Sequence, residues 1–131
     1  MGSIALMRVD APNGVIEIGY VTFSDHLKRT RMATEAIYLL MNYVFNVLGY
    51  RRLEWKCDAL NAPSRKSALR LGFVFEGIFR QAAVVKGKNR DTAWFSMLDK
   101  EFFYKKHSFI KWLSADNFDT NGTQLTALAA N

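Results

Sequence analysis

The sequence predicts a mixed α/β domain in which helices flank a central, mostly antiparallel sheet. Two observations support this class. Segments with the two-residue period of a strand alternate with segments of helical period, and their order is strand, strand, helix, strand, helix, strand, strand, helix. The 131 residues, 50% of them hydrophobic and 23% charged, suffice for one domain with a core. A disordered or fibrous protein is therefore excluded.

Two strands are expected near the N-terminus, at residues 4–9 and 15–23. The intervening residues 10–14 hold a proline and an Asn-Gly pair, the turn chemistry that joins antiparallel neighbours, so the two strands form a hairpin. Gly19 interrupts the second strand. A strand glycine marks a β-bulge, a close approach of another backbone or a ligand, or a packing gap, and the sequence leaves these open.

An amphipathic helix is expected next, followed by a strand with one buried face. The helix ends at Gly49, a residue common just past a helix C-terminus. Its apolar residues recur at helical spacing, at Ala33, Ile37, Leu40, Met41, Val44, Phe45 and Leu48. Leu53, Trp55 and Cys57 then alternate with charged residues, as on a half-buried strand. A helix between two strands implies that this strand lies parallel to the preceding one.

The rest of the chain reads as a short helix, a second hairpin, a last helix and a tail. The short helix begins at Asn61, which caps it, with Pro63 in its first turn, and ends at residues 71–73. The hairpin joins strands 73–85 and 92–98 through a turn at 86–89. The last helix, about 100–113, places four apolar residues on one side, namely Phe102, Phe109, Ile110 and Leu113. Residues 1–114 form the domain and 115–131 a tail, whose last dozen or so residues are expected to be mobile.

Charge and composition restrict the kinds of partner that the protein can bind. The net charge of +6 favours an anion: nucleic acid, an acidic surface or a phosphorylated cofactor. A single cysteine, Cys57, excludes an intrachain disulfide, and with two histidines it makes no convincing metal site, so no metal is expected. No apolar run approaches the roughly 20 residues of a membrane span, so no membrane partner is expected and the predicted location is cytoplasmic.

The most informative segment is residues 22–36, where a strand runs through a basic loop into a helix. Free N–H groups and a partial positive charge at a helix start can bind a phosphate. Lys28, Arg29 and Arg31 would add charge. The alternative is a solvated helix start capped by Thr30 or Thr34. The glycine patterns of Rossmann and P-loop nucleotide sites do not occur here.

Four segments in this order resemble the GNAT superfamily of acetyl-CoA-dependent N-acetyltransferases, and within it the branch related to ribosomal-protein N-terminal acetyltransferases. They are the interrupted strand 16–23, the loop and helix start 28–36, the stretch 61–77 and residues 91–96. The resemblance covers about residues 4–113. It implies a GNAT-like acyl-CoA N-acyltransferase fold and transfer of an acetyl group from acetyl-CoA, by direct attack of a primary amine of a small molecule or a protein N-terminus.

The resemblance also implies which residues hold acetyl-CoA. The backbone of the interrupted strand would pair with the pantetheine arm, at Tyr20, Val21, Thr22 and Phe23. The loop and helix start would cradle the pyrophosphate, at Lys28, Arg29, Thr30, Arg31, Met32, Ala33 and Thr34. Asn61 and Ser64 would lie near the thioester.

Three departures from the family pattern stand out. Arg31 occupies the position of the first glycine in the phosphate loop, where it can bond to phosphate through a charged side chain. Ala68 stands where many members have a tyrosine that acts as general acid, so Ser64 is the expected substitute, either as acid or as hydrogen-bond donor to the thiolate; the alternative is that Ser64 only helps to cap its helix. The N-terminal portion that walls the acceptor site is expected to be missing, which exposes sheet edges and favours homodimerisation.

Direct attack needs a group that takes the proton of the amine. The candidates are Glu17, Glu54 and Asp91, with His26 as a further one, although exposed strand carboxylates usually only solvate a face.

Two other function classes remain as alternatives. One is a module that binds acetyl-CoA or dimerises without catalysis. The other is nucleic-acid binding, through the basic loop 86–90 and the aromatic residues Trp94, Phe102, Phe103 and Tyr104. Those aromatic residues have core-like spacing, so a nucleic-acid partner is not expected.

Overall fold

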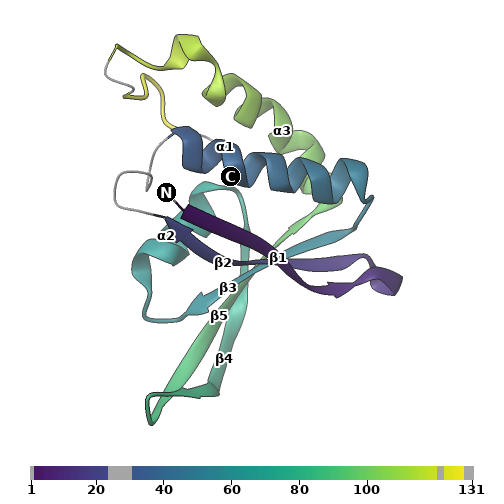
Figure 1. Ribbon diagram of the computed structural model, residues 1–131, viewed down its shortest axis with the longest axis vertical. Helices are drawn as coiled ribbons and strands as arrows, with labels where there is room; N and C mark the ends of the chain where they lie inside the picture. The colour runs from purple at the N-terminus through teal and green to yellow at the C-terminus, as the bar shows by residue number, and fades with distance from the viewer. Residues whose placement is uncertain (1, 24–30, 121–122, 129–131) are drawn as a thin grey trace.

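The computed structural model describes residues 2–23, 31–120 and 123–128, and it confirms the mixed α/β class (Figure 1). A 3-10 turn, Ala11–Asn13, lies between the first two strands, and a π-helical turn, Tyr43–Val47, extends the first helix. The strands and α-helices in chain order are β1 (Gly2–Asp10), β2 (Val15–Phe23), α1 (Arg31–Asn42), β3 (Arg52–Asp58), α2 (Ala62–Arg70), β4 (Val74–Val85), β5 (Lys88–Leu98) and α3 (Asp99–Leu113).

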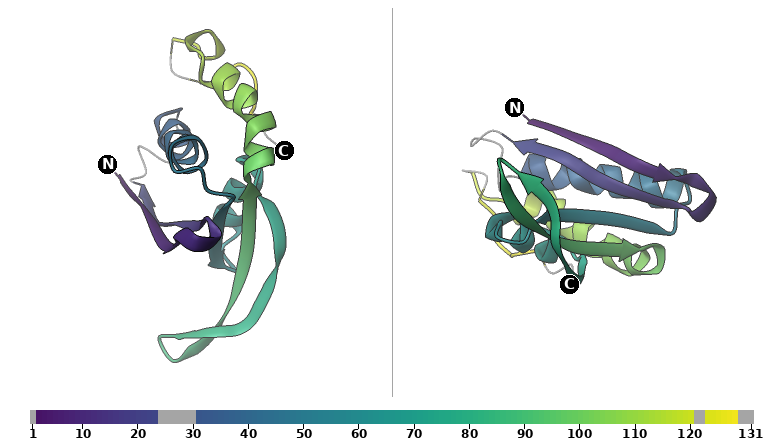
Figure 2. Two further views of the ribbon diagram at one scale, coloured as in Figure 1. Left: turned by 90° about the vertical axis from the view of Figure 1, so that its right-hand side faces the viewer. Right: turned by 90° about the horizontal axis from the view of Figure 1, so that it is seen from below.

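The strands form one five-stranded sheet in the order β1-β2-β3-β5-β4. The β2–β3 pair is parallel and the other pairs are antiparallel, which confirms both hairpins and the parallel pair. Helices α1 and α3 lie side by side on one face of the sheet (Figure 2), and the β4–β5 hairpin extends away from them (Figure 1). The other face of β2, β3 and β5 is not covered by these helices.

The second hairpin turns tightly at Lys86 and Gly87. Both residues have positive φ, 53° and 76°, as in the two-residue turns that match the twist of paired strands. Strand β5 therefore begins at Lys88, four residues before the predicted start at residue 92. The predicted strand was too short because this part of the hairpin is exposed and polar. Its residues therefore show no alternation of apolar and polar side chains that would indicate a strand.

Strand β2 is irregular at Gly19. The β1–β2 register shifts between the pairs Ser3↔Thr22 and Ala5↔Gly19, so β2 holds an extra residue there. A Cβ on Gly19 would collide with the sulfur of Met7. The structure therefore shows the bulge, whereas the close neighbour of this glycine is a side chain and not another backbone.

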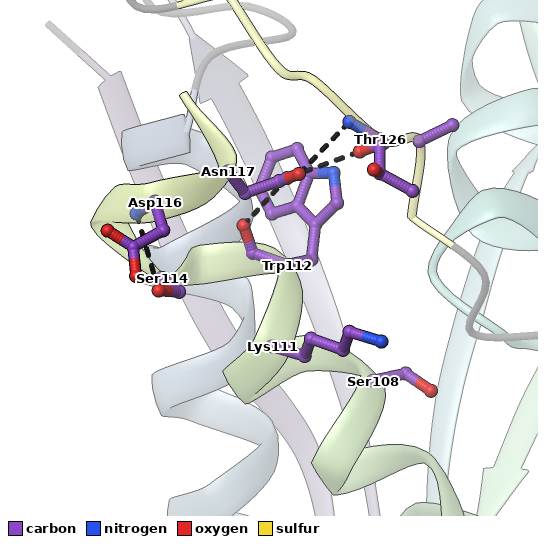
Figure 3. A pocket seen from close by; sticks show the side chains of 8 residues that line it. Ser108, Lys111, Trp112, Ser114, Asp116, Asn117 and Thr126 are labelled. Atoms are coloured by element: carbon purple, nitrogen blue, oxygen red, sulfur yellow. Dashed lines mark hydrogen bonds between the residues drawn. The ribbon is translucent and has the colours of Figure 1, made fainter. Parts of the chain in front are cut away.

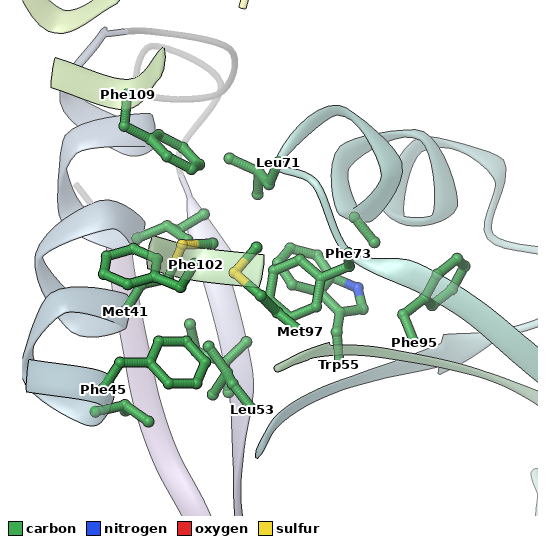
Figure 4. Close-up of a cluster of buried hydrophobic side chains, with 14 of the residues drawn as sticks. Met41, Phe45, Leu53, Trp55, Leu71, Phe73, Phe95, Met97, Phe102 and Phe109 are labelled. Atoms are coloured by element: carbon green, nitrogen blue, oxygen red, sulfur yellow. The ribbon is translucent and has the colours of Figure 1, made fainter. Parts of the chain in front are cut away.

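The core lies between the sheet and helices α1 and α3 (Figure 4). Alternate residues of β3, namely Leu53, Trp55 and Cys57, are buried as predicted. Phe102 of α3 stacks on Phe45 of the π-helical turn, with ring centroids 5.1 Å apart. The helical spacing also predicted the buried positions Ala33, Ile37 and Met41 of α1 and Val44 and Phe45 of the π-helical turn. Leu48, predicted on the same side, is exposed.

One residue of the predicted apolar side of α3 is misplaced. Ile110 is 50% exposed, whereas Trp112, not assigned to that side, is only 6% exposed. Phe102 and Phe109 are buried as expected. A position three residues after Phe109 lies closer to its side of the helix than the adjacent position does, so Trp112 completes the buried side.

The described part of the tail contacts the C-terminal end of α3 through a few specific residues. Trp112 donates its indole N–H to Gln124 at 2.9 Å, and Leu128 is only 8% exposed. The Asn117 side chain donates to the Trp112 carbonyl and exchanges hydrogen bonds with the Thr126 backbone (Figure 3). The polar residues that made this tail look unstructured satisfy one another's backbone groups.

Candidate functional site

Strands β2 and β3 separate in the middle of the sheet. Their parallel pairing runs from Val15↔Arg52 to Ile18↔Trp55, yet β2 continues to Phe23 and β3 to Asp58. The backbone of residues 19–23 therefore has no pairing with β3. We call the region between these two diverging segments the split. An edge of this kind can hydrogen-bond to an extended ligand that carries amide groups.

Helix α1 begins shortly after β2, and its start supplies the N–H groups of a helix first turn. Of the residues that the resemblance assigns to the pyrophosphate, Lys28, Arg29 and Thr30 lie outside the described residues, as does the base candidate His26. The side chains of Tyr20, Val21, Thr22 and Phe23 are likewise outside the description, although their backbone is part of β2.

The described side chains at the start of α1 make hydrogen bonds within the protein. Arg31 donates to the Leu113 carbonyl at 2.7 Å, and its guanidinium lies over the Phe118 ring. The Thr34 hydroxyl, 3% exposed, accepts from Arg70 at 3.1 Å. These contacts tie α1 to α2, to α3 and to the tail. Met32 is exposed and Ala33 is buried.

The start of α2 lies against β3 at the split. The Asn61 side chain caps the helix by accepting the Ser64 backbone N–H at 3.1 Å, as predicted. The Ser64 hydroxyl itself does not cap the helix. It accepts a hydrogen bond at 3.1 Å from the indole N–H of Trp55, the last β3 residue in register with β2.

Glu17 lies on the sheet face opposite the helices. Its neighbours Ile16 and Ile18 point into the core, so alternation directs Glu17 the other way. It is only 2% exposed. Oε1 lies 3.5 Å from Lys56 Nζ and 3.8 Å from Arg8 Nε, whereas Oε2 lies on the side of Gly19, where the split begins.

The pKa of Glu17 is raised above its ordinary value because burial disfavours the charged form; the nearby Lys56 and Arg8 oppose this rise. A carboxylate with a raised pKa beside a gap in the sheet is a candidate for proton transfer.

The other two carboxylates are less well placed. Glu54 accepts from Arg52 at 3.0 Å, and Arg52 also pairs with Glu76. Asp91 is exposed, and it accepts the Gln81 backbone N–H at 2.7 Å. Its backbone lies beside the C-terminal end of β3, where its carbonyl accepts the Ala59 N–H at 2.9 Å. The carboxylate of Asp91 is thus engaged by Gln81, whereas Glu17 is buried next to Gly19.

Sequence reasoning missed Lys56, Arg8 and Trp55 as parts of the site. Lys56 could have been inferred from the strand pairing. The parallel register places Glu54 opposite Glu17, so Lys56, the next residue on the same face of β3, lies diagonally beside Glu17. Arg8 has a positive φ of 52° near an irregularity in β1, which alternation does not predict. The Trp55–Ser64 bond joins a strand to a helix and has no local signal.

Two surface hollows are lined by residues of the described ranges. One of about 470 Å³ is at the C-terminal end of α3, where Lys111, Trp112 and Asn117 contribute to its lining (Figure 3). Another is lined by Arg80, Gln81 and Asp91 on the hairpin. Neither lining includes Glu17 or Ser64.

No helix in the described ranges is long and apolar enough to span a membrane.

Comparison with known proteins identifies the class of this fold as that of the N-acetyltransferases. Residues 1–74 match the acetyltransferase (GNAT) domain family. The crystal structure of a GCN5-related N-acetyltransferase from Brucella melitensis shares 56% identity, with a TM-score of 0.95, over 97% of this chain and 57% of that one. The chain belongs to the GNAT family.

Two curated relatives extend the comparison. An uncharacterized N-acetyltransferase, p20, from Bacillus licheniformis is 34% identical over 78% of this chain and 57% of its own length. The ribosomal-protein-serine acetyltransferase of Escherichia coli is 32% identical over 63% of this chain and 45% of its own length. The chain thus spans about half the length of the relatives that it matches.

Proposed function

We propose that this chain is the acetyl-CoA-binding and catalytic part of an N-acetyltransferase that acetylates a primary amine by direct attack. The observation that carries the proposal is the split between β2 and β3, with the α1 start beside it, Ser64 on one side and the buried carboxylate of Glu17 on the other. Family membership supports the same reaction.

Acetyl-CoA would be held mainly by backbone groups. Residues 19–23 of β2 offer N–H and C=O groups to the amides of the pantetheine arm, and the first turn of α1 offers N–H groups to the pyrophosphate. The arm would then lead the thioester into the split. When bound, acetyl-CoA supplies the activated acetyl group.

Ser64 and Glu17 would act on the reaction from opposite faces of the sheet. The amine nitrogen bonds to the thioester carbonyl carbon, and the carbon–sulfur bond breaks with its electron pair left on sulfur. Glu17, directly or through a water, takes the proton that the amine loses. The Ser64 hydroxyl donates a hydrogen bond to the thiolate, which takes up one proton, so one proton is released and one is consumed.

The acceptor is proposed to be the primary amine of a protein N-terminus or of a small molecule. One relative is named a ribosomal-protein-serine acetyltransferase, which favours a protein N-terminus.

Calorimetric titration with acetyl-CoA at low and high salt tests the cofactor site. We expect saturable binding that weakens with salt, because the pyrophosphate is anionic and exposed charges are screened.

Arg29→Ala is expected to weaken acetyl-CoA binding by about 1–2 kcal/mol. Arg31→Ala is expected to lower the melting temperature with little change in affinity, since Arg31 bonds to Leu113.

A folded protein without any acetyl-CoA binding would contradict the proposal. Binding without transfer to any amine in an acceptor screen would instead favour a non-catalytic acetyl-CoA-binding module. Loss of affinity in Arg31→Ala with unchanged stability would return the Arg31 side chain to the phosphate site.

Homodimerisation is proposed for the edge of the sheet formed by β4. Exposed apolar side chains gather along this edge strand, at Val74, Phe75, Ile78, Phe79, Val84 and Val85. Sedimentation at increasing concentration tests this: a mass that stays that of one chain would exclude a dimer.

A further inference from the structure

A buried indole holds the hydroxyl of Ser64. Trp55 Nε1 lies 3.1 Å from Ser64 Oγ, and Trp55 is 5% exposed, with its ring tilted against Phe73 at 5.4 Å. The backbone N–H of Ser64 is held separately, by the Asn61 side chain. Backbone and hydroxyl of Ser64 are therefore positioned by two different residues.

The direction of this hydrogen bond determines where the Ser64 proton can go. An indole N–H only donates, whereas a serine hydroxyl has one proton and two lone pairs. Because Trp55 uses a lone pair, the proton stays available for another acceptor. A serine in a helix often gives this proton to a carbonyl one turn earlier. Within the described chain, the hydrogen bonds of Ser64 include no such bond.

Two further features connect this pair to the split. Trp55 is opposite Ile18 in the last paired position of β2 and β3, so Ser64 is held where the strands separate. A hydroxyl that accepts a hydrogen bond also becomes a stronger donor, because linked hydrogen bonds polarise one another. The indole thus improves the donor as well as orienting it.

We infer that Trp55 is a positioning residue for acetyl transfer, whose indole N–H holds the Ser64 hydroxyl with its proton free for the thioester sulfur in the split. The inference rests on the proposed function. Its consequence is a lowered thiol pKa for CoA bound at this site, because a hydrogen bond to the thiolate favours the charged form.

The experiment measures the pKa of the bound CoA thiol from the ultraviolet absorbance of its thiolate, with CoA affinity measured by calorimetry. Trp55→Phe removes the indole donor but keeps an aromatic ring. We expect it to raise the bound thiol pKa by about half a unit to one unit. Ser64→Ala should raise that pKa at least as much, and adding Trp55→Phe to it should change nothing more, because Trp55 acts through Ser64.

Trp112→Phe is the matched control. Trp112 is 6% exposed and also donates its indole N–H to a side chain, that of Gln124 at 2.9 Å, so this variant repeats the chemical change away from the split. The thiol pKa should stay at the wild-type value. Should Trp55→Phe fail to fold, benzothienylalanine at position 55 keeps the shape of the indole and lacks the donor.

Each outcome decides the inference. An unchanged thiol pKa in the folded position-55 variant, with CoA still bound, overturns it. A rise that persists in the Ser64→Ala background also overturns it, since Trp55 would then act by another route. No CoA binding by the folded wild-type chain overturns the proposed function itself, and the inference with it.

Discussion

Replacing Glu17 with Gln is expected to lower kcat by about 10²–10⁴-fold, the usual range for loss of a general base. The amide has nearly the shape of the carboxylate, so the packing around this 2% exposed side chain is kept. What is lost is the ability to take a proton on the side of Gly19 and the split. Steady-state kinetics with acetyl-CoA and an acceptor amine measure the change.

Glu54→Gln is the matched control, because Glu54 lies opposite Glu17 in the parallel register. Its carboxylate is bound to Arg52 instead, so a much smaller loss of kcat is expected. If the two variants lose activity equally, or if Glu17→Gln keeps wild-type kcat, Glu17 is not the base.

The pH dependence of the rate follows from the raised pKa of Glu17. Glu17 accepts a proton only when it is ionised, so kcat/KM should fall as pH drops through that raised pKa. Lys56→Met removes a charge 3.5 Å from Oε1 that lowers this pKa. The acidic limb of the profile should therefore move to higher pH in Lys56→Met and vanish in Glu17→Gln.

The same pKa shift has a cost in stability. The native state binds the Glu17 proton more tightly than the unfolded chain does. Proton binding by Glu17 therefore adds to the free energy of unfolding, and this contribution is fully present below the pKa that Glu17 has in the unfolded chain. It is lost as pH rises through the raised native pKa. Glu17→Gln should remove this part of the pH dependence in urea unfolding. An unchanged dependence would mean that the native pKa of Glu17 is not raised.

The second large effect concerns the core: Phe102→Ala should reduce the free energy of unfolding by about 3–5 kcal/mol. Phe102 is 2% exposed and lies between the rings of Phe45 and Tyr38, at 5.1 and 6.2 Å. Its removal leaves a cavity between α1 and α3, the two helices that cover the sheet (Figure 4). Urea unfolding followed by circular dichroism measures the loss.

Phe103→Ala makes the same chemical change one residue further along α3. Phe103 is 72% exposed, so its loss should change stability by only about 0.5 kcal/mol or less. Where Phe102→Ala is too unstable to study, Phe102→Leu keeps most of the volume and should cost less. Equal effects of Phe102→Ala and Phe103→Ala would show that the packing of α1 on α3 is not as described.

The sequence by itself determined the features that arise from neighbours along the chain. The alternation of Leu53, Trp55 and Cys57 predicted which face of β3 is buried, and Asn61 predicted the cap of α2. Gly19 marked the place where β2 becomes irregular. Such signals work because the periods of helices and strands, and the bonds of caps and turns, involve residues only a few positions apart.

Only the tertiary structure decided which side chains the site can use. Arg31 bonds to the carbonyl of Leu113, 82 residues away, a contact that no local pattern predicts. Trp55 binds the hydroxyl of Ser64, and Lys56 and Arg8 surround Glu17. These contacts depend on which strands pair, in which register, and where the helices pack. That information is distributed over the whole chain, because long-range contacts form only once all of these elements are in place.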